Sequence, residues 1–93
     1  MKKRTFHAFS DPGHGWLKVP LKLIIELNIN LSVTSYSYYR NGFVYLEEDG
    51  DWSLFHDAMT KRFGSYNTKG FITDKSSKIR NYKSFNSLKT VTV

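Results

Sequence analysis

Residues 7–20 read HAFSDPGHGWLKVP, and this stretch decides how the first half of the chain folds. At its centre stands Asp11-Pro12-Gly13, a strong turn signal because proline fixes φ and glycine tolerates positive φ. Side chains alternate on both sides of the turn, so we expect one strand over residues 5–10 and a returning strand over residues 15–19. Pro20 suits the first turn of a helix, which the apolar spacing extends to residue 28. The stretch therefore predicts a β-hairpin followed by a helix.

A second hairpin is expected around Arg40-Asn41-Gly42, because Asn-Gly between two alternating runs favours a two-residue turn. Its strands are predicted over residues 31–39 and 43–47. An amphipathic helix from Trp52 to Phe63 is expected to follow, with Asp51 as its N-cap.

Gly64 is placed to end this helix. Residues 67–74 predict a last strand, weakened by Gly70, and a helical turn is expected at residues 84–88. The element order β-β-α-β-β-α-β predicts an α+β fold with a small, mostly antiparallel sheet of five strands and two helices on one face. The 93 residues are expected to form a single small domain, 1–93, in which residues from about 86 to 93 are flexible.

The formal net charge of +6 is unevenly distributed along the chain. Residues 1–60 carry six Lys/Arg and seven Asp/Glu, whereas residues 61–93 carry eight Lys/Arg and one Asp. A basic end of this kind favours an anionic partner such as a nucleic acid, a nucleotide or an acidic protein. A solvated, soluble tail is the alternative.

Cysteine is absent, which excludes disulfides, thiol catalysis and cysteine metal clusters, and fits a reducing compartment. No long apolar stretch follows the basic start, so we do not expect a secretory signal. The longest apolar run, residues 21–27, is interrupted by Lys22 and Glu26 and is too short to cross a bilayer. A cytoplasmic protein without a membrane partner is therefore expected.

Four blocks of sequence are distinctive: His7–Pro20, Tyr36–Tyr38, Val44–Asp49 and Ser77–Tyr82. In these blocks the chain resembles a family of small, uncharacterised proteins from bacteriophages and mobile elements. The resemblance covers most of the chain but not the residues after Phe85. It implies a phage-type setting in the cytoplasm of a host cell, and it carries no catalytic residues. Inhibition of a host defence is a hypothesis that comes from this setting alone.

His7, Asp11 and His14 could meet across the first hairpin as a zinc or iron site. Their spacing matches no established ligand motif, so ordinary surface and hydrogen-bonding roles are the alternative. Clustered carboxylates after the second hairpin could hold Mg²⁺ for phosphodiester cleavage. Neighbouring strand residues point to opposite faces, however, and helix capping explains the last two carboxylates without a metal. This acidic cluster consists of Glu47, Glu48, Asp49 and Asp51.

Three segments offer groups that suit an anionic or aromatic ligand. The turn after Pro12 could hold a phosphate on backbone N–H groups, with a tryptophan for stacking; burial of that tryptophan in the core is the alternative. Exposed tyrosines beside an arginine suit base stacking or a protein interface, and the basic segment from Lys75 to Lys83 suits phosphate contact. The candidate ligand-binding residues are His14, Gly15, Trp16, Tyr36, Tyr38, Arg40, Lys78, Arg80, Tyr82 and Lys83.

These observations favour a non-enzymatic phage-type accessory protein that binds an anionic partner: nucleic acid, a nucleotide-like signal or an acidic host protein. No cofactor is expected. A small metal-dependent hydrolase or nuclease is the second hypothesis. A protein–protein adaptor that forms a homodimer through the tyrosine face of the sheet is the third.

Overall fold

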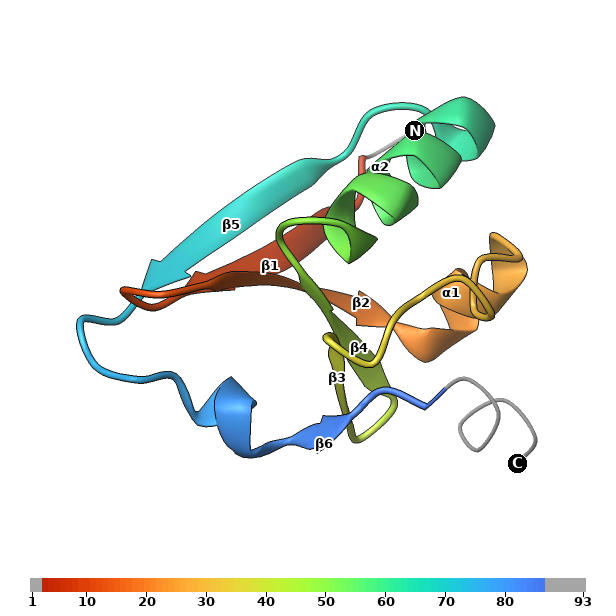
Figure 1. Cartoon of the computed structure of the whole chain (residues 1–93). Helices are drawn as coiled ribbons and strands as arrows, with labels where there is room; N and C mark the ends of the chain where they lie inside the picture. The colour runs from red at the N-terminus through yellow and green to blue at the C-terminus, as the bar shows by residue number, and fades with distance from the viewer. Residues whose placement is uncertain (1–2, 87–93) are drawn as a thin grey trace.

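The computed structural model describes residues 3–86 and confirms the α+β class (Figure 1). One sheet carries six strands in the order β5-β1-β2-β4-β3-β6 rather than the five strands predicted. β1 and β5 pair in parallel, and every other pair is antiparallel. The elements are β1 (Thr5–Ser10), β2 (Gly15–Pro20), α1 (Leu21–Glu26), β3 (Tyr38–Arg40), β4 (Phe43–Glu47), α2 (Asp51–Phe63), β5 (Asn67–Ile72), the 3-10 turn η1 (Lys78–Asn81) and β6 (Lys83–Ser84).

The first hairpin forms as predicted, with Phe9 opposite Trp16 across β1 and β2. Pro20 is the N-cap of α1 and lies just before its first helical residue. The helix ends two residues earlier than expected. Asn28 then adopts a left-handed φ of 61°, which ends the helical path.

The second hairpin turn is also confirmed, because Asn41 and Gly42 both have positive φ, 53° and 85°. The predicted strand over residues 31–39 is wrong, since only Tyr38–Arg40 form a strand. Thr34 and Ser37 donate hydrogen bonds to the Asp51 carboxylate instead. Such side-chain bonds offer a segment an alternative to sheet pairing.

The helix α2 begins and ends close to the prediction, and Gly64 follows it with φ 88°. The predicted N-cap is wrong, because Gly50 occupies that position and Asp51 is the first helical residue. Phe63, the last residue of the predicted amphipathic helix, is exposed.

The last part of the chain departs most from the prediction. β5 lies at the sheet edge and is exposed along its whole length. The helical turn lies at residues 78–81 instead of 84–88, and Ser84 belongs to β6. The remainder of the predicted turn, residues 87–88, lies outside the described residues, as does most of the segment 86–93 that we expected to be flexible.

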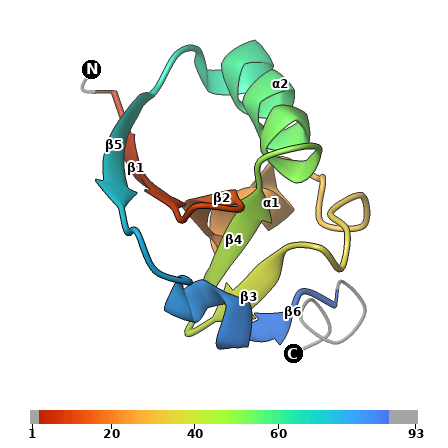
Figure 2. The same cartoon turned by 60° about the vertical axis from the view of Figure 1, so that its left-hand side comes forward.

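Apolar side chains pack on both faces of the sheet. Both helices cover one face, and the segment around η1 lies against the other (Figure 2). We call this second face the η1 face. Its buried side chains are Trp16, Tyr45 and Ile79. No helix within residues 3–86 is long and apolar enough to cross a membrane.

Candidate functional site

Asp11 closes the turn of the first hairpin through its own side chain. Its Oδ1 accepts hydrogen bonds from the backbone N–H groups of Gly13 and His14, both at 2.9 Å. The backbone N–H of Asp11 also donates to the carbonyl oxygen of His14 at 2.9 Å. This is the local bonding for which aspartate is favoured in turns. The turn is therefore built around a fixed carboxylate.

The same carboxylate anchors a segment far along the chain. Arg80 donates from Nε to Asp11 Oδ2 at 2.6 Å and from Nη2 to Oδ1 at 2.8 Å, and the backbone N–H of Ser77 donates to Oδ2 at 2.9 Å. The Arg80 bonds, followed by the Ser77 bond, hold the pKa of Asp11 well below its usual range. The pair in turn raises the pKa of Arg80. We call this arrangement the Asp11–Arg80 clamp.

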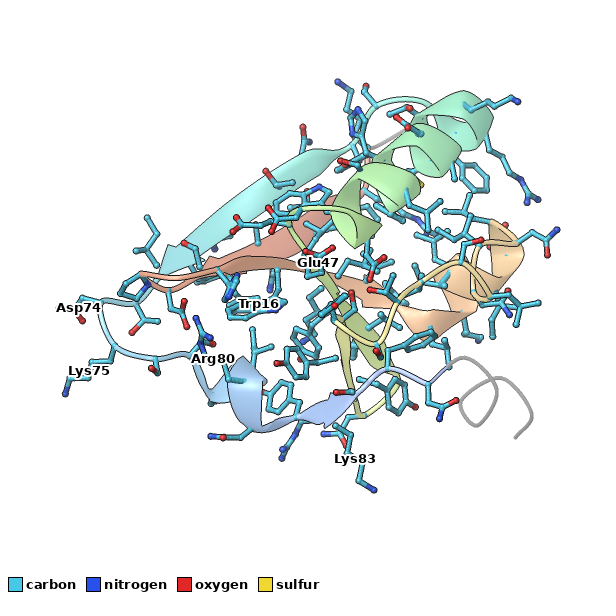
Figure 3. The ribbon with its side chains drawn as sticks, viewed as in Figure 1. Trp16, Glu47, Asp74, Lys75, Arg80 and Lys83 are labelled. Atoms are coloured by element: carbon cyan, nitrogen blue, oxygen red, sulfur yellow. The ribbon has the colours of Figure 1, made fainter. Side chains whose placement is uncertain are left out.

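The clamp also places Arg80 beside Trp16, with 5.5 Å between the guanidinium carbon and the ring (Figure 3). A Cβ on Gly13 would lie 2.8 Å from Arg80 Nη2, so the close approach of the guanidinium needs glycine there. Trp16 itself is only 2% exposed. Trp16 is therefore a core residue of the η1 face, as in the alternative to ligand stacking given above.

The three candidate metal ligands, His7, Asp11 and His14, are not grouped around a common point. Asp11 is engaged by Arg80, the His7 ring lies against Phe71 with centroids 5.0 Å apart, and His14 lies near Trp16 at 6.1 Å. Within residues 3–86, no three His, Asp or Glu side chains are grouped so that they could hold a metal ion. The hydrolase hypothesis therefore has no metal centre in the described part of the chain.

Two members of the acidic cluster have structural roles at the start of α2. The Glu47 carboxylate accepts hydrogen bonds from the backbone N–H groups of Asp49, Gly50 and Asp51. Burial would raise the pKa of Glu47, but these bonds outweigh it and lower the pKa. Asp51 Oδ2 accepts from the hydroxyls of Thr34 and Ser37. The hydrogen bonds of these two carboxylates therefore hold the segment around residues 34–37 and the start of α2 together.

Three predicted segments do meet, in a hollow of about 590 Å³ that we call the acidic hollow. It brings together the hairpin turn, the first tyrosines and the basic segment. Carboxylates also line it, however, which disfavours an anionic ligand there. The lining residues are His14, Trp16, Thr34, Tyr36, Tyr38, Glu47, Asp49, Gly50, Asp51 and Arg80.

A second hollow, of about 380 Å³, lies on the η1 face and has the opposite character. We call it the basic hollow. Three cations and four aromatic rings line it, and none of its lining residues is a carboxylate. They are Phe9, Lys18, Arg40, Asn41, Phe43, Tyr45, Ser77, Lys78, Ile79 and Tyr82.

Cations in the basic hollow lie over aromatic rings. Lys18 Nζ is 4.3 Å from the Phe43 ring centroid, and the Arg40 guanidinium is 4.9 Å from that of Tyr82. The Tyr82 ring meets Tyr45 edge-on at 5.1 Å. Burial, followed by the neighbouring Tyr82, raises the pKa of Tyr45 and keeps its hydroxyl protonated.

The predicted ligand-binding residues thus divide between two hollows. Arg40, Lys78 and Tyr82 line the basic one, whereas five of the others line the acidic one. Gly15 lines neither: it is buried, and a Cβ there would lie 2.8 Å from Glu48 Oε2. Lys83 lines neither and points outward from β6 (Figure 3).

The prediction missed three lining residues on central strands: Phe9, Lys18 and Phe43. Tyr45 belongs to the tyrosines that were expected on the surface of the second hairpin, but it was not among the candidate ligand-binding residues. Strand alternation would have placed Phe43 and Tyr45 on one face, and Phe9 on one face of its own strand. The register of β2 between its two neighbours was needed to put Lys18 among them.

Comparisons with protein-family models, with curated proteins and with solved structures find no match to this chain.

Proposed function

We propose that the basic hollow binds an anionic ligand that carries a planar ring, as nucleotides and nucleic acids do. The observation that carries this proposal is the lining: Lys18, Arg40 and Lys78 stand among aromatic rings without a carboxylate beside them. Cations match phosphates, and aromatic rings provide surfaces for bases. A volume of about 380 Å³ lies within the range of small-ligand sites, about 300–1,000 Å³.

The aromatic rings separate this proposal from the alternative of an acidic host protein. Carboxylates on a partner surface would need the cations of the hollow but not the ring faces of Phe43 and Tyr82. The tyrosine adaptor would rely on Tyr36 and Tyr38, which line the acidic hollow and of which Tyr36 is exposed. The basic hollow is the more specific of the two surfaces, because it combines charge with stacking groups.

The resemblance to small bacteriophage proteins gives this proposal a biological setting. In the cytoplasm of a host cell, a non-enzymatic accessory protein could sequester a nucleotide-like defence signal or cover a nucleic acid. Both ligands offer phosphate and base to the same side chains. Inhibition of a host defence is part of the proposal on this ground.

Nuclear magnetic resonance titration with ATP tests the proposal, with tripolyphosphate as an anion that lacks a ring. We expect ATP to bind more tightly and to shift the ring protons of Phe43 and Tyr82. Arg40→Ala and Lys78→Ala should weaken ATP binding. Lys61→Ala removes the same charge from the exposed end of α2 and is the matched control. Equal affinity for the two anions, or shifts confined to the acidic hollow, would contradict the proposal.

A further inference from the structure

The basic hollow shares lining residues with two neighbouring hollows. Toward α1 it shares Lys18 and Phe43 with a hollow of about 670 Å³, which we call the α1 hollow. Toward β5 it shares Phe9 and Lys78 with a hollow of about 330 Å³, which we call the β5 hollow. The three hollows are therefore neighbours on the molecule, and we call them together the depression.

Positive charge extends along this depression. The α1 hollow adds Arg4 and Lys22 to the cations of the basic hollow. Glu26 also lines it, and its carboxylate lies 3.9 Å from the guanidinium of Arg62. No carboxylate lines the β5 hollow. A polyanion could therefore follow the whole depression with cations beside it.

Aromatic rings continue beyond the basic hollow as well. In the β5 hollow, the Phe71 ring stacks on Phe9 with centroids 5.2 Å apart and an interplanar angle of 20°. Phe71 is 38% exposed, and Lys69 Nζ lies 5.6 Å from its centroid. The register of the parallel pair places Phe71 beside Phe9 on the η1 face. A ring with a cation nearby thus recurs on β5, three strands along the sheet from Phe43 on β4, or about 14 Å at a strand spacing of about 4.8 Å.

Resting on the function proposed above, we propose that the ligand is a single-stranded nucleic acid whose successive nucleotides occupy the basic hollow and its two neighbours. A mononucleotide would fill the basic hollow and leave Lys22 and Phe71 unused. In a duplex the bases are stacked on one another, so they would not present their faces to Phe43, Tyr82 and Phe71. A single strand offers phosphates and unstacked bases at once, which matches the recurring pairing of cation and ring.

Fluorescence anisotropy with labelled oligothymidylates of one, two, four and eight nucleotides tests this inference. We expect affinity to rise with length and then level off once the depression is filled. Phe71→Ala should weaken binding of the eight-mer about 5- to 150-fold, as the loss of one stacked base predicts, but leave the mononucleotide unaffected. Lys22→Ala should reduce the salt slope of eight-mer binding by about 0.7. Lys61→Ala is again the matched control.

The outcomes separate the inference from the proposed function. If the mononucleotide and the eight-mer bind equally and both variants match the unaltered chain, the single-strand inference is overturned while the anion site stands. If neither binds, both fail. An eight-base-pair duplex that competes as well as the single strand would also overturn the inference. Oligouridylate of the same length distinguishes RNA from DNA: equal binding supports readout of rings and phosphates, as the sequence-neutral lining predicts.

Discussion

Replacing Ser37 with alanine tests the loop that the sequence did not predict. Ser37 is fully buried, donates to Asp51 Oδ2 at 2.6 Å and accepts from the backbone N–H of Glu47 at 3.0 Å. A hydrogen bond to a charged group contributes about 1.5–3 kcal/mol, and an unpaired buried group costs about 1–3 kcal/mol. Asp51 keeps its two bonds to Thr34, so we expect the free energy of unfolding to fall by about 2–3 kcal/mol.

Urea unfolding followed by circular dichroism measures this loss. At about 4–8 °C per kcal/mol for a domain of this size, the melting temperature should fall by about 8–24 °C. Ser35→Ala is the matched control, because Ser35 is exposed in the same loop and a surface change should cost less than about 0.5 kcal/mol. If Ser37→Ala and Ser35→Ala are equally stable, the hydrogen bonds to Asp51 and Glu47 do not hold this loop.

Three further predictions test the basic hollow, the clamp and the backbone. Lys78→Ala should reduce the salt slope of ligand binding by about 0.7, because Lys78 lines the basic hollow. Lys61→Ala, at the exposed end of α2, should leave the slope unchanged; equal slopes for the two variants in anisotropy titrations would contradict this. Because the pKa of Asp11 is lowered in the folded state, its carboxylate stabilises the fold above about pH 4, and this stability is lost as the carboxylate is protonated at lower pH. Asp11→Asn should therefore be less stable than the unaltered chain at pH 7. The difference in the free energy of unfolding should narrow in unfolding titrations towards pH 2. Gly64→Ala should lower the free energy of unfolding by about 1–3 kcal/mol, because Gly64 has φ 88° and ψ −163°. Gly70→Ala should raise it by about 0.5 kcal/mol, because a Cβ at Gly70 would meet open space. Denaturant unfolding measures both changes.

The local elements of this fold follow from short-range signals. Asp11-Pro12-Gly13 and Asn41-Gly42 specify their turns through backbone dihedrals, and those signals act over a few residues. The spacing of Phe55 and Met59 likewise fixes the buried face of α2. Both hairpin turns and both helices were therefore predictable before any tertiary contact was known.

The segment from 31 to 37 shows where such signals fail. Its alternation matches a strand, yet the Asp51 carboxylate attracts Thr34 and Ser37 from 17 and 14 residues away. Binding to a buried carboxylate replaces sheet pairing here, and alternation carries no information about that partner. β5 is a second case, since its parallel register with β1 depends on contacts across most of the chain.

The candidate site was predictable in its residue types but not in its grouping. Tyr82 and Lys78 were identified from a basic, aromatic segment, and Arg40 from the hairpin turn. Their assembly with Lys18 depends on how η1 folds back against the central strands. That step is governed by a clamp between residues 69 positions apart, which no local pattern encodes.

The clamp also explains why the charge excess of residues 61–93 overstates the charge available for binding. Arg80 belongs to that excess, but its guanidinium is paired with Asp11, so it contributes little field to a ligand. Lys78, two residues earlier, carries its charge to the basic hollow and joins cations from β2 and β3. One short turn thus supplies a cation for anchoring and a cation for binding. The function proposed for the η1 face consequently depends on the anchor, because releasing Arg80 would detach Lys78 from Lys18 and Arg40.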